Sequence, residues 1–265
     1  IIRVVQYWWE LTAINVATDN PKFASVDGHL FDNTKTKFLC YARANTGESY
    51  TVPDGVKEIY EEAFRLTASD SRVLRNITLP NGLKIIGKGA FQHCNKLQTI
   101  TIPNGVIEIG TYAFDGCSSL KSMTIPESVT SIGESAFYGC SGLTSVSIPE
   151  NVTQIESYAF GSCYNLTSIT IPNGVTSLGV YAFNWCQSLT SIIIPSSVTN
   201  ICKGAFSKCT NLITITCLAI VPPVVWQPYN DAFEDSSIRT VKVPAGSVEA
   251  YRAAVGWRNL TIVAL

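Results

Sequence analysis

The 265-residue sequence predicts a solenoid, a right-handed superhelix of about ten coils of 23 residues. We expect mostly parallel β-strands joined by short helical or 3₁₀ turns. The dipeptide Ala-Phe occurs eight times, and a proline and a cysteine recur in step with it. A fixed period of about 20 to 50 residues is typical of solenoids, in which each repeat packs on its neighbours. The periodic residues are Phe64, Phe91, Phe114, Phe137, Phe160, Phe183, Phe206 and Phe233; Pro80, Pro103, Pro126, Pro149, Pro172 and Pro195; and Cys94, Cys117, Cys140, Cys163, Cys186 and Cys209.

Each coil is expected to begin with a strand. In the coil that starts at Leu97, this residue forms an L-x-x-L-x-L pattern with Ile100 and Ile102, the strand signature of leucine-rich repeats. Side chains alternate along a strand, so Ile100 and Ile102 should point inward and the threonines between them outward. Pro103 ends the strand because it has no N–H for the ladder.

The remainder of the coil returns the chain to the next strand. Gly105 provides a turn, since glycine adopts positive φ at little cost. Val106 and Ile109 predict a second short strand on the opposite side of the coil. Phe114 then fills the coil interior from a tight helical or 3₁₀ turn. Because one coil leaves its apolar faces uncovered, only a stack of coils should be stable.

The chain is expected to be one domain, residues 1–265, with specialised ends. Residues 1–52 predict irregular N-terminal coils, 53–217 regular 23-residue repeats, and 218–265 an insertion followed by a C-terminal cap. The first residues, with no initiator Met, suggest a repeat already under way in a processed chain or a fragment.

The cap is assigned to residues 244–265. Ser247 is the expected N-cap of a short helix with Val248, Tyr251 and Val255 on one face. A helix over the last open coil would keep the solenoid monomeric.

The repeated unit resembles that of the BspA-like leucine-rich-repeat surface proteins. It has the form Ile-Pro-x-x-Val-Thr-x-Ile-Gly-x-x-Ala-Phe-x-x-Cys-x-x-Leu, from Ile125 through Leu143 and again from Ile148 through Leu166. The segments 25–28 and 243–251 also resemble the irregular coil and terminal unit of that family. The resemblance covers essentially the whole chain. It implies a secreted or cell-surface protein that binds host matrix proteins, glycoproteins or other cells, and it transfers no catalytic or binding residues.

Composition argues against several classes of partner. The net charge of −1 gives no electrostatic reason to expect nucleic acid. No apolar run approaches the roughly 18 residues of a membrane span, so we expect no membrane insertion by this chain. Between positions 141 and 200 the only charged residues are Glu150 and Glu156.

The periodic cysteines are the most prominent chemical feature. Stacked coils would bring neighbouring thiols within disulfide reach, but a parallel column does not converge on zinc. Their spacing favours a ladder of small buried residues, since free cysteine is commonly buried. Histidine occurs only as His29 and His93, and no catalytic motif is present. We therefore expect no enzyme, no metal site and no cofactor.

The outward strand face is the main candidate contact surface. Hydroxyl side chains should repeat about 4.8 Å apart across coils, giving a flat and uncharged array. The alternative is that small polar and β-branched residues suit any solvated strand face. Regular Thr-x-Thr arrays also resemble ice-binding solenoids, but serine occupies many of these positions. The candidates are Thr99, Thr101, Ser122, Thr124, Ser145, Ser147, Ser168, Thr170 and Ser191.

Departures from the repeat add a second set of candidates. Trp185 stands where other coils have glycine or serine, Ile193 replaces an outward hydroxyl, and Trp226 lies in the proline-rich insertion. Exposed aromatic and apolar residues often mark contact sites. These three residues are the preferred contact region, and packing of each against neighbouring loops is the alternative.

Together these features predict a non-enzymatic binding module, a bacterial surface or secreted adhesin. Its expected partner is a matrix protein, glycoprotein or glycan on a host or neighbouring cell, and its expected location is extracellular or at the cell surface. The alternative is a structural spacer that presents another module of a longer surface protein.

Overall fold

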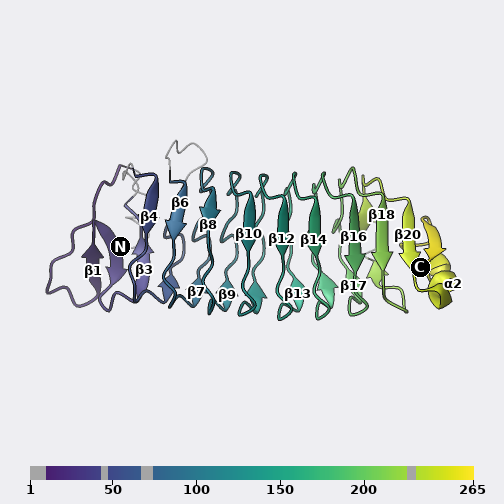
Figure 1. Cartoon of the computed structure of the whole chain (residues 1–265), viewed down its shortest axis with the longest axis horizontal. Coiled ribbons are helices and arrows are strands. Elements are labelled where there is room, and N and C mark those ends of the chain that lie inside the picture. Colours follow the sequence, from purple (N-terminus) through teal and green to yellow (C-terminus); the bar gives the residue numbers. More distant parts are fainter. Residues whose placement is uncertain (1–9, 43–46, 67–73, 226–230) are drawn as a thin grey trace.

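The computed structural model describes residues 10–42, 47–66, 74–225 and 231–265. It confirms the predicted solenoid of parallel strands, and the described chain winds about nine times, close to the expected ten (Figure 1). Each regular coil contributes one strand to a row of longer strands, which have three or four residues except for one of two residues, and one strand to a row of two-residue strands.

The longer strands form the first row. Neighbouring strands pair in parallel in three sheets, β4-β6-β8, β10-β12-β14 and β16-β18-β20-β21. Residues one period apart face each other, as in the pairing of Ser122 with Ser145. The strands are β4 (Ser49–Thr51), β6 (Asn76–Thr78), β8 (Thr99–Ile100), β10 (Ser122–Thr124), β12 (Ser145–Ser147), β14 (Ser168–Thr170), β16 (Ser191–Ile194), β18 (Thr214–Cys217), β20 (Thr240–Val243) and β21 (Thr261–Ala264).

The two-residue strands form the second row, as the valine–isoleucine pattern predicts. This row is divided into the continuous orders β5-β7-β9-β11 and β13-β15-β17-β19. Its strands are β5 (Glu58–Ile59), β7 (Ile85–Ile86), β9 (Glu108–Ile109), β11 (Ser131–Ile132), β13 (Gln154–Ile155), β15 (Ser177–Leu178), β17 (Asn200–Ile201) and β19 (Val224–Val225). The last of these shows that the proline-rich insertion still supplies a strand to the coil.

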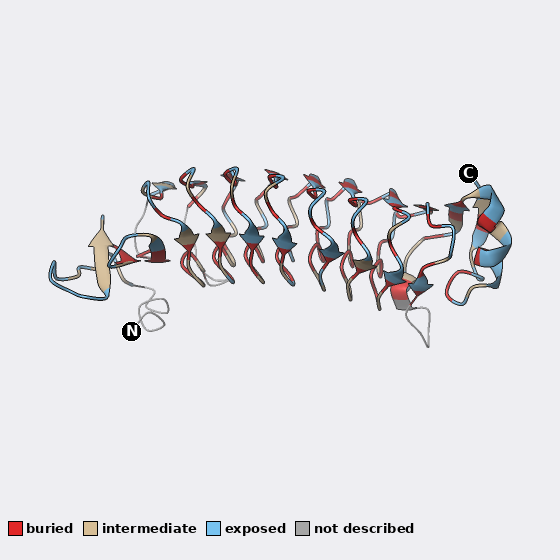
Figure 2. Ribbon diagram, turned by 90° about the horizontal axis from the view of Figure 1, so that it is seen from below, coloured by how far each residue is buried: buried red, intermediate tan, exposed pale blue. Residues whose placement is uncertain are grey.

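The phenylalanines of the Ala-Phe pairs form a continuous stack along the interior. Adjacent rings are nearly parallel, with centroids 5.4 Å apart for Phe114 and Phe137 and 5.4 Å apart for Phe137 and Phe160. The stack continues to Phe38 at one end and to Trp257 at the other. Buried residues therefore line the inside of every coil and exposed residues its outside (Figure 2).

Seven of the eight Ala-Phe pairs lie in hydrogen-bonded turns, whereas the sequence suggested helical or 3₁₀ turns; the eighth, Ala232-Phe233, does lie in a 3₁₀ helix. In the part of the chain that the structure describes, 3₁₀ geometry occurs at η1 (Asp231–Phe233) and η2 (Ala245–Ser247). The residue before each of those seven pairs has positive φ, as at Tyr112 (φ 58°), which interrupts helical backbone geometry. The turns are joined along the axis, because Phe114 donates its N–H to the Ala136 carbonyl of the next coil.

The N-terminal end begins with an antiparallel meander in place of a coil. Strands β1 (Phe23–Val26), β2 (His29–Asp32) and β3 (Lys37–Cys40) follow one another, and β3 then pairs in parallel with β5. Asp27 and Gly28 both have positive φ, which suits the two-residue turn between β1 and β2.

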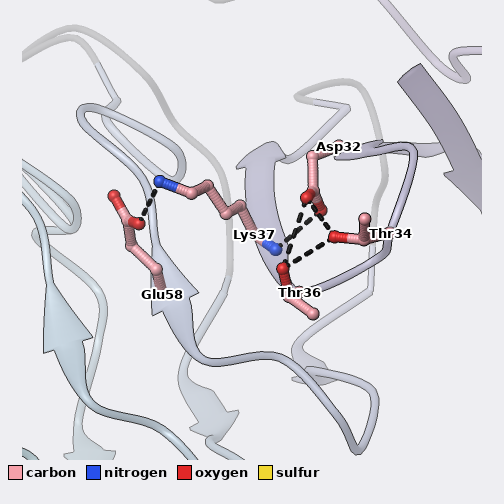
Figure 3. A network of polar contacts seen from close by, with 5 residues as sticks. All are labelled: Asp32, Thr34, Thr36, Lys37 and Glu58. Carbon is pink, nitrogen blue, oxygen red and sulfur yellow. Dashed lines mark hydrogen bonds and ion pairs between the residues drawn. The ribbon is translucent and has the colours of Figure 1, made fainter. Parts of the chain in front are cut away.

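A carboxylate holds the turn between β2 and β3 (Figure 3). Asp32 accepts hydrogen bonds from the Lys37 N–H at 2.8 Å and from the hydroxyls of Thr34 and Thr36. Burial opposes ionisation of Asp32, but these hydrogen bonds outweigh it and keep its pKa below the ordinary value. The Lys37 ammonium lies 2.6 Å from the carboxylate of Glu58, so the meander is tied to the first regular coil.

The C-terminal end carries a short helix, α2 (Val248–Ala253), beside strand β21 (Figure 1). Ser247 is the N-cap residue as predicted, but its side chain makes no capping hydrogen bond. The helix ends before Val255, which is exposed, so the predicted apolar face is wrong at that residue. Tyr251 is buried, and its hydroxyl donates to the Ala219 carbonyl at 2.8 Å. The capping function of 244–265 stays a prediction.

Candidate functional site

The outward side chains of the longer strands form an exposed and nearly uncharged face. Within β10, β12 and β14, the inward residues are buried and the flanking serines and threonines are exposed. Ser122, Ser145 and Ser168 stand in register in successive strands. A second line runs parallel to this one, formed by Thr124, Ser147 and Thr170.

Many hydroxyls of this face have no partner within the described chain. Neither line of three makes a side-chain hydrogen bond there, whereas the neighbouring Thr144 and Thr167 donate theirs to carbonyls of the preceding coil. Thr99 differs, since its hydroxyl lies 2.6 Å from Asn76 Oδ1. The face therefore presents ordered rows of free donors and acceptors.

A shallow hollow of about 360 Å³ separates β8 from β10, which belong to different sheets. Thr99, Thr101, Ser122 and Thr124 line it, together with Asn104. The predicted contact residues of two neighbouring coils therefore surround one hollow. Its hydroxyl and amide side chains suit a ligand with hydroxyl or amide groups, while Met123 and Pro126 add apolar surface.

A second hollow, of about 310 Å³, lies between β14 and β16, where the sheet is again interrupted. Ser168, Thr170, Ser191 and Ile193 line it, as does Leu218. Ile193 is 59% exposed, so this hollow has an apolar margin.

Leu218 is a contact candidate that the sequence reasoning missed. It directly follows β18 and aligns with Pro195, the residue that ends β16. Ile220 and Val221 follow it and are 73% and 77% exposed. The sequence did contain a signal for it, because position 218 has leucine where the periodic proline would fall.

Trp185 and Ile193 lie in different surroundings, although the sequence grouped them. The Trp185 ring contacts Tyr164 edge to face at 6.2 Å, and the Lys208 ammonium lies 5.1 Å from its centroid. Lys208 is also 2.8 Å from Asp235. Trp226, the third member of that group, falls outside the described residues.

Two positions in each coil have a left-handed backbone. One precedes the Ala-Phe pair and the other precedes the periodic cysteine. Glycine fills some of these positions, including Gly116, Gly139 and Gly204, while Tyr158, Tyr181 and Trp185 have φ of 57°, 55° and 61°. A left-handed conformation costs a residue with a side chain about 1–2 kcal/mol.

Three tyrosines gather on this turn side of the solenoid. The rings of Tyr158 and Tyr181 stack with centroids 5.2 Å apart, and Tyr138 meets Tyr158 edge to face at 6.1 Å. We call these three residues the tyrosine ledge. Burial is the main cause of a raised pKa at Tyr158, and the neighbouring Tyr181 and Tyr138 add to it.

The periodic cysteines are free and buried, which agrees with the packing interpretation. Burial is the principal reason that the pKa of the Cys117, Cys163 and Cys186 thiols lies well above the ordinary value. It raises the pKa of Cys209 to about 12. Such thiols carry almost no thiolate at neutral pH and are poor nucleophiles.

The described part of the chain holds no group of three or more histidine, cysteine or acidic residues that could bind a metal ion. His93 is half-buried in a turn with φ 61°, while His29 is buried in the N-terminal meander. Nor does any helix in the described ranges have the length and apolar character to cross a bilayer.

Comparison with known proteins connects this geometry to a family. Residues 34–152 and 130–255 match the family described as "BspA type Leucine rich repeat region (6 copies)". No curated protein matches the sequence.

Solved structures share the fold. A leucine-rich repeat protein from Eubacterium ventriosum is 28% identical with a TM-score of 0.62, and the match covers 85% of this chain and 53% of that one. The chain therefore spans about half the length of that protein. A leucine-rich repeat protein from Bacteroides ovatus is also 28% identical, with a TM-score of 0.58 and coverage of 93% and 68%. The pneumococcal vaccine antigen PcpA, 22% identical with a TM-score of 0.53, shares the fold over 96% of this chain and 50% of its own.

Proposed function

Because this chain belongs to the BspA-type leucine-rich-repeat family of bacterial surface proteins, we propose that it is a non-enzymatic binding module of a cell-surface or secreted adhesin. Its partner is a matrix protein, glycoprotein or glycan of a host or neighbouring cell. Its location is extracellular, and no nucleic acid and no cofactor takes part.

The observation that carries this proposal is the pair of free hydroxyl lines on the outward strand face. An exposed hydroxyl without an internal partner can exchange its water for a ligand group, since folding does not need it. The lines are rigid because parallel strands fix their register. The hollow between β14 and β16, with Ile193 and Leu218 at its margin, adds a place for an apolar group.

The direct test is binding of the purified chain to immobilised fibronectin, fibrinogen, laminin and mucin. One variant carries Ser145→Lys and Ser168→Lys on the strand face, and a second carries Ile193→Lys. The control is Thr153→Lys, an exposed substitution outside the strand face.

Saturable binding that the strand-face variants lose and the control keeps is the expected result. Binding that survives both variants would refute the strand face as the contact surface. A wild-type chain that binds none of the four partners would favour the structural-spacer alternative.

A further inference from the structure

Three coils carry the same Pro-Asn-Gly turn after their longer strand. The asparagines Asn81, Asn104 and Asn173 are exposed, and each is followed by glycine within the turn. In each turn the residue after the glycine donates its N–H to the proline carbonyl, as Val106 does to Pro103 at 3.2 Å. Because the tripeptide is the same in all three, its chemical differences between coils come from the surrounding structure.

An asparagine followed by glycine can lose its side-chain amide without an enzyme, since glycine has no side chain to hinder its own nitrogen. That nitrogen gives its proton to hydroxide and attacks the asparagine Cγ atom. A C–N bond forms, the Cγ–Nδ2 bond breaks, and ammonia leaves with a proton from water, which gives a cyclic imide. Water then opens the ring to aspartate or isoaspartate, so water is the only co-reactant and no electron is transferred. The reaction depends on a free glycine nitrogen, because a hydrogen bond from its N–H holds that nitrogen in place.

One of the three glycine nitrogens is held by the next coil. Gly105 donates its N–H to the Ser128 hydroxyl at 2.9 Å, and that hydroxyl donates in turn to the Val106 carbonyl at 2.7 Å. Gly105 has φ 110°, as a type II turn requires at its third residue. The nitrogen that would attack Asn104 is therefore tied to a side chain that a second hydrogen bond fixes.

The other two glycine nitrogens, of Gly82 and Gly174, donate no hydrogen bond within the described residues. Neither glycine has positive φ. Beside Gly82, the place of the serine is taken by Gly105, which has no side chain. Beside Gly174 a serine is present, but Ser197 donates its hydroxyl to the Val175 carbonyl at 2.6 Å and accepts nothing from the glycine. Both nitrogens are thus free to react.

The turns at Gly82 and Gly105 have similar electrostatic surroundings. A Cβ atom on Gly82 would lie 2.8 Å from Lys57 Nζ, and a Cβ on Gly105 would lie 3.1 Å from Lys84 Nζ. An ammonium group in this place stabilises the negative charge that develops during the attack. Because each turn has such a lysine, the hydrogen bond to Ser128 is the difference between them that bears on the reaction.

We propose that Asn81 and Asn173 are sites of spontaneous deamidation in the folded protein, and that the Ser128 hydroxyl protects Asn104 from it. The turn accepts a carboxylate, since another coil has Asp54 at the same position. Each of the three asparagines lines a hollow of the strand face. Deamidation therefore adds negative charge to a nearly uncharged surface. The inference is independent of the proposed function, because the reaction needs no partner.

The test follows deamidation of the folded chain at pH 8 by peptide mass spectrometry. Trypsin places the three asparagines in separate peptides, because Lys84 and Lys121 lie between them. The chain unfolded in guanidinium chloride gives the reference rate for each asparagine. Ser128→Ala removes the acceptor, and the matched control is Ser197→Ala, the same position beside a glycine that does not use it. Thermal melting of each variant checks that the solenoid is intact.

In the folded wild type we expect Asn104 to react about fivefold or more slowly than Asn81 and Asn173, with similar rates for all three in the unfolded chain. Ser128→Ala should accelerate Asn104 by about the same factor and leave the other two unchanged, and Ser197→Ala should change none. Equal rates in the folded wild type, no reaction at Asn81 and Asn173, or no acceleration in Ser128→Ala would overturn the proposal. The comparison within the wild type needs no variant, so it decides the proposal even where a variant unfolds. Since no partner is present, none of these results bears on the adhesin proposal.

Discussion

The thiol of Cys140 donates a hydrogen bond to the backbone carbonyl of Phe114 in the preceding coil, with 3.2 Å between sulfur and oxygen. The same bond recurs from Cys117 to Phe91 and from Cys163 to Phe137. The rings of these phenylalanines also stack on one another, so the periodic phenylalanine and cysteine connect successive coils by both packing and hydrogen bonding. The column of cysteines is thus part of the connection between coils.

The buried thiols should resist modification in the native protein. Cys202 is half-buried, whereas the other cysteines are buried, and burial keeps the pKa of Cys140 and Cys209 high. We expect one thiol to react quickly with Ellman's reagent at pH 8, and the others to react only after denaturation. The control is Cys202→Ser, which should abolish the fast reaction. Several fast thiols in the native wild type would contradict this account.

Removal of a ring from the centre of the stack should cost more than removal at its end. Phe137 is fully buried between two rings, so Phe137→Ala should lower the free energy of unfolding by about 3–5 kcal/mol. Phe233 is half-buried, and Phe233→Ala should cost less. Urea denaturation followed by circular dichroism measures both. Equal losses would show that the stack does not transmit stability between coils.

Trp185 should tolerate glycine better than alanine. Both substitutions remove the contacts with Tyr164 and Lys208, but only glycine relieves the positive φ. We expect Trp185→Gly to be more stable than Trp185→Ala by about 1 kcal/mol. Thermal unfolding of both variants is the measurement. At Thr153, which is not among the positive-φ positions, alanine should be the more stable of the two, and the same order at both sites would exclude backbone strain as the cause.

Acid should destabilise the N-terminal meander through His29. The ring is buried against Tyr41 and Tyr50, and its Nδ1 accepts the N–H of Ala42. Burial lowers its pKa to about 4, although nearby Asp27 acts in the opposite direction. The neutral form is therefore favoured in the folded state, and the unfolded chain binds the proton more tightly.

The contribution of His29 to the free energy of unfolding should consequently be fully present above about pH 6.5. It should be lost as the pH drops toward 4, which lowers the free energy of unfolding by up to about 3 kcal/mol. The His29→Gln variant keeps an acceptor for Ala42 but does not titrate, so its unfolding free energy should vary less in this range. Denaturation at pH 7 and pH 4.5 compares the two proteins. Identical pH dependence would rule out His29 as the titrating group.

The sequence was sufficient for the fold because the interior of a solenoid repeats. Each coil buries the same side-chain types at the same positions, so a column such as Phe114 and Phe137 is visible as a period. The inward direction of Ile100 and the exposure of Thr99 also follow from strand alternation. The meander did not follow from the period, although Asp27-Gly28 is a recognised hairpin signal.

The contact surfaces depended on neighbours that no single repeat specifies. Register along the strands decides that Ser145 is free while Thr144 bonds to the preceding coil. Stacking of coils places Lys208 over Trp185, and the interruption between β14 and β16 opens the hollow beside Ile193. The sequence by itself determined the coil, because burial within one coil is periodic. The tertiary structure alone decided which exposed groups meet across coils, because those contacts arise from residues that depart from the repeat.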